Sequence, residues 1–131
     1  MIDEKENYLF NTFPNLFPGG KNADMQVSLM RFGFPGDGWF ELIKDLCEKI
    51  TEMKVGVTVV QVKEKFGGLR FYIDFNEGTS KEDIHKVYEL ISQAEDKAYT
   101  ICEQCGKPGI IREDRHWILT LCDECNKPKD A

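Results

Sequence analysis

The chain has 131 residues, enough for one domain with a modest core. It carries 17 Lys and Arg residues against 23 Asp and Glu residues, a net charge of −6. This acidic balance disfavours binding to duplex nucleic acid, whose affinity comes largely from neutralised phosphates. No apolar run is long enough to span a bilayer, and residues 1–6 lack the basic start and apolar stretch of a signal peptide. We therefore expect a cytoplasmic protein with reduced thiols and no membrane contact.

The N-terminal part predicts a helix followed by a strand. Residues 3–12 form a short helical pattern with Tyr8 and Leu9 facing inward, and Pro14 follows its end. Residues 25–34 alternate roughly between apolar and polar side chains, which is typical of a strand.

A second helix begins after a turn at residues 35–38 and runs to about Met53, with Asp37 as the expected N-cap. A helix N-terminus behind glycines can bind an anion, but Asp37 would occupy the same amides, so a cap with a Trp anchor is favoured. Cys47 lies on the apolar face and is expected to be a buried, inert thiol. That face recurs every three or four positions: Trp39, Ile43, Leu46, Ile50 and Met53.

The clearest β pattern covers residues 57–75. Residues 57–63 are rich in β-branched side chains, and residues 69–75 alternate between apolar and polar ones. The Gly-rich connection at 64–68 predicts a hairpin with one face on the core and the other towards solvent.

A long helix follows, with Ser80 as its N-cap and Asp83 completing a capping-box pattern. Its predicted apolar stripe leads directly to Cys102 and consists of Ile84, Val87, Ile91, Ala94, Ala98 and Ile101.

Two Cys-x-x-Cys pairs at the C-terminus predict a structural zinc site: Cys102, Cys105, Cys122 and Cys125. Four thiolates complete the tetrahedral shell of a closed zinc site, which leaves no position for a catalytic water. Gly106 and Asn126 follow the two pairs and suit the left-handed backbone of such turns. A redox motif or a disulfide fits less well, because the first pair ends a helix and there are two pairs.

These elements predict an α+β fold: a small antiparallel sheet packed against two helices, with a C-terminal zinc ribbon or truncated treble clef. We place the α+β domain at residues 1–101 and the ribbon at 102–131. The six residues after Cys125 include Pro128 and are too few for the helix of a full treble clef.

The hairpin connection is also a candidate anion site. Lys63, Lys65 and Arg70 flank two glycines, whose free N–H groups would suit a phosphate. Phe66 or Tyr72 can stack on a base. No Walker-type pattern is present, and a solvated hairpin tip is the commoner interpretation of such a segment. The candidate ligand-binding residues are Lys63, Lys65, Phe66, Gly67, Gly68, Arg70 and Tyr72.

Four segments carry a resemblance to a known family: Phe32-Gly33-Phe34 with Gly36-Asp37-Gly38-Trp39, the run from Lys63 to Tyr72, the run from Cys102 to Gly109, and Trp117 with Leu119-Thr120-Leu121-Cys122-Asp123. Over about residues 30–125 the chain resembles small, uncharacterised proteins encoded by phages, prophages and bacterial chromosomes. The resemblance implies a phage or accessory-gene setting and a C-terminal zinc knuckle. The last ligand position looks like His in some similar proteins, whereas here it is Cys125.

No enzyme signature is found, and the favoured hypothesis is a non-enzymatic, zinc-stabilised binding protein. Its ligand would be a small anion, a nucleotide that serves as a host immune signal, and it would act in the host cytoplasm by sequestration. The alternative is a protein-interaction module that inhibits or adapts a host protein. A nucleic-acid-binding ribbon ranks last, because no basic stripe is visible in the ribbon. The sequence leaves open whether the chain forms a homodimer.

Overall fold

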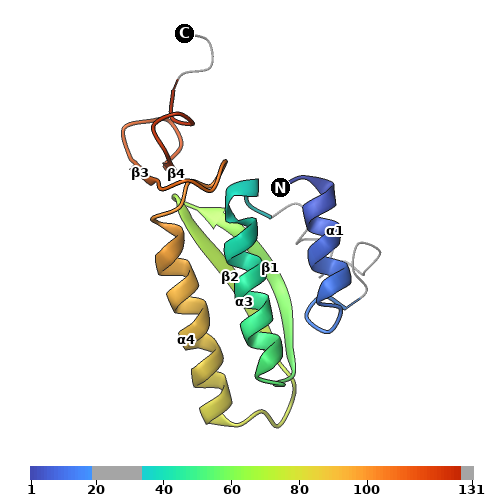
Figure 1. The fold of residues 1–131 in the computed structure, drawn as a ribbon. Helices are drawn as coiled ribbons and strands as arrows, with labels where there is room; N and C mark the ends of the chain where they lie inside the picture. The colour runs from blue at the N-terminus through green and yellow to red at the C-terminus, as the bar shows by residue number, and fades with distance from the viewer. Residues whose placement is uncertain (19–33, 128–131) are drawn as a thin grey trace.

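The computed structural model describes residues 1–18 and 34–127, and it confirms the α+β class (Figure 1). Most of the expected strand at 25–34 lies outside the described residues. The C-terminal cysteine unit is ribbon-like, with a short antiparallel hairpin of its own. The elements in chain order are α1 (Asp3–Thr12), the 3-10 turn η2 (Asp37–Trp39), α3 (Phe40–Glu52), β1 (Val57–Lys65), β2 (Gly68–Phe75), α4 (Lys81–Ala98), β3 (Ile110–Arg112) and β4 (Leu119–Leu121).

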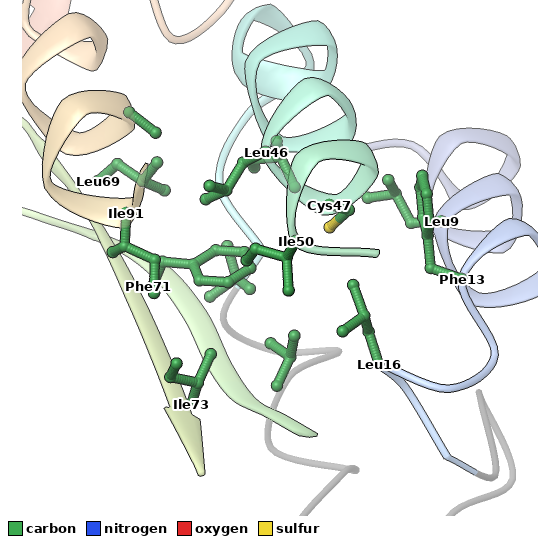
Figure 2. Close-up of a cluster of buried hydrophobic side chains, with 14 of the residues drawn as sticks. Leu9, Phe13, Leu16, Leu46, Cys47, Ile50, Leu69, Phe71, Ile73 and Ile91 are labelled. Carbon is green, nitrogen blue, oxygen red and sulfur yellow. The ribbon is translucent and has the colours of Figure 1, made fainter. Parts of the chain in front are cut away.

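Helices α3 and α4 lie side by side over one face of the β1–β2 hairpin, as Figure 1 shows. The two strands pair antiparallel, with an irregularity between Val59 and Gln61. The core forms where the apolar stripes of both helices meet the inward face of the hairpin (Figure 2). Burial of these stripes is the main stabilising term of the fold. Fully buried members include Leu9, Phe17, Trp39, Ile43, Ile50, Val59, Val62, Leu69 and Val87.

Helix α4 follows the pattern expected from its sequence. The Ser80 hydroxyl accepts a hydrogen bond from the Asp83 N–H at 3.1 Å, which confirms the N-cap. The buried residues of the helix lie on one stripe: Val87, Ile91, Ala94 and Ala98. None of the helices in the described part of the chain is long and apolar enough to cross a membrane.

Two expectations for the N-terminal part were wrong. Tyr8 is 41% exposed, and its ring packs edge-on against Phe40 at the surface. Leu9 occupies the buried position instead. Asp37 does not cap a helix. Its carboxylate instead accepts a hydrogen bond from the backbone N–H of Ile2 at 2.8 Å, so it fixes the start of the chain against η2.

On each outer edge of the β1–β2 hairpin, one backbone N–H donates a hydrogen bond to a group outside the sheet. On β1, the N–H of Val59 donates to the carbonyl of Leu16 at 2.8 Å. On β2, the N–H of Phe71 donates to the carboxylate of Glu95 on α4 at 3.1 Å. These contacts matter because an unpaired strand edge is a template for unwanted pairing.

Candidate metal centre and the hairpin beside it

The four C-terminal cysteines converge on one point. Their Sγ atoms all lie within 4.8 Å of one another, and the Sγ atoms of Cys105 and Cys122 are 3.6 Å apart. A tetrahedral ion with metal–sulfur bonds of about 2.3 Å needs sulfurs roughly 3.8 Å apart, so the set fits such an ion. Cys102 and Cys122 are buried, whereas Cys105 is exposed. The arrangement can therefore hold a metal between the protein interior and its surface.

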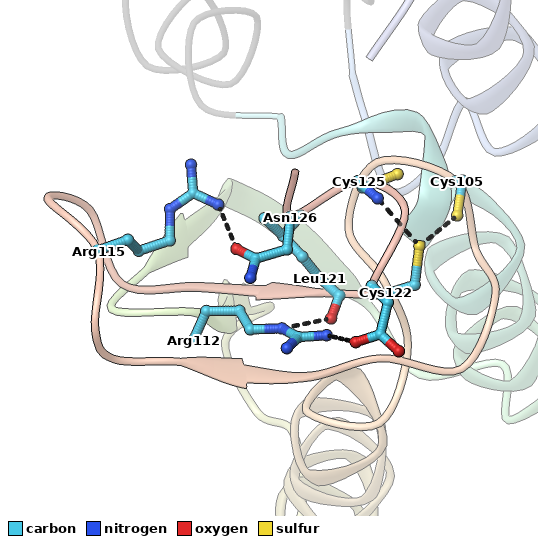
Figure 3. Close-up of polar contacts among 8 residues, drawn as sticks. Cys105, Arg112, Arg115, Leu121, Cys122, Cys125 and Asn126 are labelled. Atoms are coloured by element: carbon cyan, nitrogen blue, oxygen red, sulfur yellow. Dashed lines mark hydrogen bonds and ion pairs between the residues drawn. The ribbon is translucent and has the colours of Figure 1, made fainter. Parts of the chain in front are cut away.

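Local contacts shape the two cysteine turns (Figure 3). Gly106 has φ +84°, as expected for the first turn. Asn126 does not adopt the left-handed backbone expected of it; its side chain instead accepts a hydrogen bond from Arg115 at 3.0 Å. The N–H of Cys125 donates to the Sγ of Cys122 at 3.4 Å. Such N–H···S bonds stabilise a thiolate, the form that binds a metal.

Arg112 fastens β3 to the second cysteine turn (Figure 3). Its Nε donates to the carbonyl of Leu121 at 3.1 Å, and its terminal nitrogen lies 2.8 Å from the Asp123 carboxylate. The Arg112 side chain is only 15% exposed. These hydrogen bonds replace the water contacts that the guanidinium loses on burial. They also link the β3–β4 hairpin to the second cysteine turn.

The thiols differ in acidity for identifiable reasons. Burial acts to raise the pKa of Cys102, but backbone N–H groups of Cys122, Cys105 and Gln104 outweigh it and lower this pKa to about 7. Burial and the neighbouring thiols raise the pKa of Cys125 to about 12. Binding of a metal would therefore release protons. Cys47 is fully buried in the core, where burial and then the charge of Glu48 raise the pKa of its thiol, so it is an inert thiol as expected.

The segment Gly36–Trp39 docks the cysteine unit onto α3, and it is not an open anion site. The N–H of Gly38 donates to the Glu103 carbonyl at 2.7 Å, and the N–H of Gly36 donates to the Glu103 carboxylate at 2.9 Å. The indole N–H of Trp39 donates to the carbonyl of Ile101 at 2.8 Å. A Cβ added at Gly38 would overlap the Cys102 carbonyl oxygen, so only glycine allows this approach. Burial raises the pKa of Glu103, opposed by the Gly36 N–H.

The ribbon also contacts the tip of the β1–β2 hairpin. The hydroxyl of Thr120, which is fully buried, donates to the carbonyl of Gly67 at 2.7 Å. The N–H of Gly67 donates to the carboxylate of Glu64 at 2.8 Å, and Gly68 packs against the hydroxyl end of the Tyr99 side chain. The expectation of free glycine amides is therefore wrong for Gly67, because Glu64 already occupies its N–H. Both glycines serve packing and the turn.

The outward face of the hairpin is cationic and aromatic. Lys63 and Arg70 lie directly opposite each other on the two strands. The Nζ of Lys63 lies 5.6 Å from the ring centre of Tyr72, and that of Lys65 lies 5.7 Å from the ring centre of Phe66. Five of the seven candidate ligand residues therefore have their side chains on one surface: Lys63, Lys65, Phe66, Arg70 and Tyr72. Their role in binding stays a prediction.

Sequence reasoning missed the residues that join these units. Thr120 and Glu95 each reach a backbone group distant in the chain, and a single Thr or Glu gives no signal of that in a sequence. The glycines of 36–38 do give a signal, but in the sequence alone it indicates only a local turn. Comparison of the chain with family models, with curated proteins and with solved structures finds no match.

Proposed function

We propose that this is a zinc-stabilised binding protein, without chemistry of its own, that holds a small anionic ligand on the outward face of the β1–β2 hairpin. A nucleotide is the ligand class that fits the side chains best. The observation that carries the proposal is the pair of facing cations, Lys63 and Arg70.

Zinc is the ion proposed for the cysteine site. Four thiolates are the donor set that zinc prefers in closed, structural sites, and they leave no position for a reacting water. In this unit the metal would supply folding energy, because the apolar cluster is small: its buried members are Leu121 and the cysteines Cys102 and Cys122. Its role would be to hold the ribbon against the hairpin tip through Thr120.

The facing pair Lys63 and Arg70 places two positive charges side by side, and the Glu95 carboxylate offsets that of Arg70 only in part. Like charges directly opposite on a sheet are destabilising, and among the described residues neither side chain has a carboxylate within ion-pair distance. The Nε of Arg70 is buried and has no hydrogen-bond partner. Buried polar groups normally have one. A bound phosphate would add a negative charge beside both cations and accept hydrogen bonds from the Lys63 ammonium and the terminal nitrogens of Arg70.

A nucleotide also matches the aromatic side chains of this face. Tyr72 is 44% exposed and lies beside Lys63, where it can stack on a base while the cations hold the phosphate. A protein of this kind needs only affinity and abundance to lower the free concentration of a signal nucleotide. We propose such sequestration, in a phage or prophage setting and in the host cytoplasm, as the biological role.

Native mass spectrometry and calorimetry with a pool of mono-, di- and cyclic oligonucleotides test this proposal. Arg70→Ala and Lys63→Ala should each weaken binding about tenfold or more, the loss of roughly 1.4 kcal/mol expected for a charge-assisted contact. Lys86→Ala, which removes a surface cation paired with Glu82 on α4, is the matched control and should bind normally. Equal affinity in all three variants would show that the ligand binds elsewhere.

A second candidate is a protein-interaction module, favoured by exposed apolar side chains on the ribbon. Trp117 is 72% exposed and Ile110 is 59% exposed. Exposed aromatic residues of this kind act as anchors in protein interfaces. A complex with a host protein, or a homodimer visible by native mass spectrometry, that Trp117→Ala abolishes and Lys63→Ala leaves intact would support this candidate over the first.

A further inference from the structure

The outward face of the hairpin carries a stripe of three cationic side chains with an aromatic side chain at each end. Along the hairpin, Tyr72 comes first, then the facing pair Lys63 and Arg70, then Lys65, and Phe66 at the turn. Each ring has an ammonium group beside it, Lys63 for Tyr72 and Lys65 for Phe66. Cationic side chains combined with aromatic stacking platforms are the recurring surface of proteins that bind single-stranded nucleic acid.

Phe66 is the unusual member of this stripe. Its backbone has φ +53° and that of Gly67 has φ +84°, so both residues of the two-residue loop are left-handed. Asn, Asp and Gly suit the first of these positions, whereas a bulky residue there is a rare outlier. The ring is nevertheless 64% exposed, so core packing does not account for it. Backbone strain of this kind clusters at sites that hold ligands.

The turn that presents Phe66 is fixed on both sides. The N–H of Gly67 is bound by Glu64 and its carbonyl by Thr120 of the ribbon. These contacts fix the backbone from which the ring extends before any ligand arrives, which lowers the entropy lost on binding. The carboxylate of Glu64 is thereby engaged with the turn, so the cations Lys63 and Lys65 are left for a ligand.

The two rings are too far apart for one base. Tyr72 and Phe66 are six positions apart in the sequence, a separation of roughly 15–20 Å at the strand rise of about 3.3 Å per residue. Stacked bases repeat at about 3.4 Å along a nucleic-acid strand. A ligand that uses both rings therefore contains several nucleotides, with phosphates between the bases at the positions of the cations.

We propose that this stripe binds a single-stranded oligonucleotide of several nucleotides, with bases stacked on Phe66 and Tyr72 and phosphates held by Lys63, Arg70 and Lys65. This proposal rests on the proposed function, because it specifies that the nucleotide ligand is part of a single-stranded nucleic acid. Asp74, two residues beyond Tyr72 on the same strand, limits the stripe at that end. A single strand also suits an acidic chain, since unpaired bases offer stacking energy that a duplex does not.

Titration calorimetry of the full-length, metal-bound protein tests the proposal, with thymidine monophosphate and with oligothymidylates of two, four and eight nucleotides. The affinity should rise with length and level off once both rings are occupied. Phe66→Asn is the decisive variant, because it supplies the Asn-Gly pair that this turn prefers. It should raise the melting temperature yet weaken octamer binding about tenfold or more, the usual effect of losing one stacking ring.

A second variant and a control separate stacking from general damage. Tyr72→Ala should weaken octamer binding to a similar degree, while Tyr88→Ala removes a half-exposed ring on α4 and should leave binding unchanged. If the monophosphate binds as tightly as the octamer and Phe66→Asn does not change octamer affinity, the single-stranded oligonucleotide proposal is overturned. The proposed binding of a small nucleotide would then still stand. If no nucleotide or oligonucleotide binds, both are overturned.

Discussion

The backbone N–H of Gly38 donates a 2.7 Å hydrogen bond to the carbonyl of Glu103, which joins the start of α3 to the first cysteine turn. Gly106 of that turn lies against Gly38, with a position for Cβ only 3.3 Å from the Gly38 carbonyl oxygen. Two glycines far apart in the chain therefore meet backbone to backbone. The cysteine unit is tied to the helical layer by this contact, and its folding should be linked to that layer.

Gly38→Ala should disrupt this junction. A Cβ at Gly38 would overlap the Cys102 carbonyl, which is backbone and cannot rotate away. We expect a loss of roughly 3 kcal/mol or more in the free energy of unfolding, at the upper end for overpacked sites. Urea unfolding measures it. Gly78→Ala is the control: it meets no atom within 4 Å and should cost only about 1–2 kcal/mol for its left-handed backbone. Equal costs for the two variants would argue against the junction.

Thr120→Val should destabilise the protein although it keeps the side-chain volume. The change leaves the Gly67 carbonyl without its donor inside a buried contact. An unsatisfied buried acceptor costs about 1–3 kcal/mol, and urea unfolding should show a loss in that range. Thr120→Ser keeps the hydroxyl and should lose less. The reverse order of the two variants would mean that the methyl group, and not the hydrogen bond, holds the ribbon to the hairpin.

Removal of the metal should unfold residues 102–127 and loosen the start of α3. The ribbon buries little apolar surface of its own, and Trp39 donates its indole N–H to Ile101 just before the first cysteine. Hydrogen exchange with and without a strong chelator should show lost protection in the ribbon and at Trp39. Protection that survives chelation in both places would contradict a structural metal.

Metal stoichiometry should depend on four cysteines and not on the fifth. Elemental analysis of purified protein should give about one zinc per chain for the wild type and for Cys47→Ala, because Cys47 is buried in the core away from the cluster. Cys102→Ala should lose the metal. Zinc loss in Cys47→Ala, in a variant that remains folded, would be incompatible with the proposed site.

The carboxyl group of Glu95 should give part of the pH dependence of stability. Burial raises its pKa above the ordinary value of 4.5, opposed by the Phe71 N–H and by Arg70. The folded state therefore holds this proton more tightly than the unfolded state, so the contribution of Glu95 is full at low pH and is lost as the pH rises through the raised pKa. Glu95→Gln keeps an acceptor for Phe71 and should flatten the decline in unfolding free energy above about pH 4.5. A decline of equal slope in both proteins would exclude this role.

Local sequence patterns predict most of the helices and strands and the cysteine cluster. Residues with a helical or alternating repeat, such as Ile43 and Ile50 on α3 or Leu69 and Phe71 on β2, are buried as their periodicity predicts. The helix at 3–12, the Ser80 cap and the cysteine cluster follow in the same way. In each case the deciding interaction is local, or it depends on one face of an element being apolar, and both can be read from neighbouring residues.

The roles of the glycines and the polar residues depend on contacts between segments far apart in the chain. Nothing near Gly38 in the sequence shows that it lies against the Cys102 carbonyl, and nothing near Thr120 shows that its hydroxyl meets Gly67. Asp37 was expected to cap a helix because the nearest backbone N–H groups in the sequence belong to that helix. Its carboxylate instead accepts a hydrogen bond from the N–H of Ile2. Hydrogen bonds are short and directional, so their partners are set by which surfaces the packed helices and hairpin bring together.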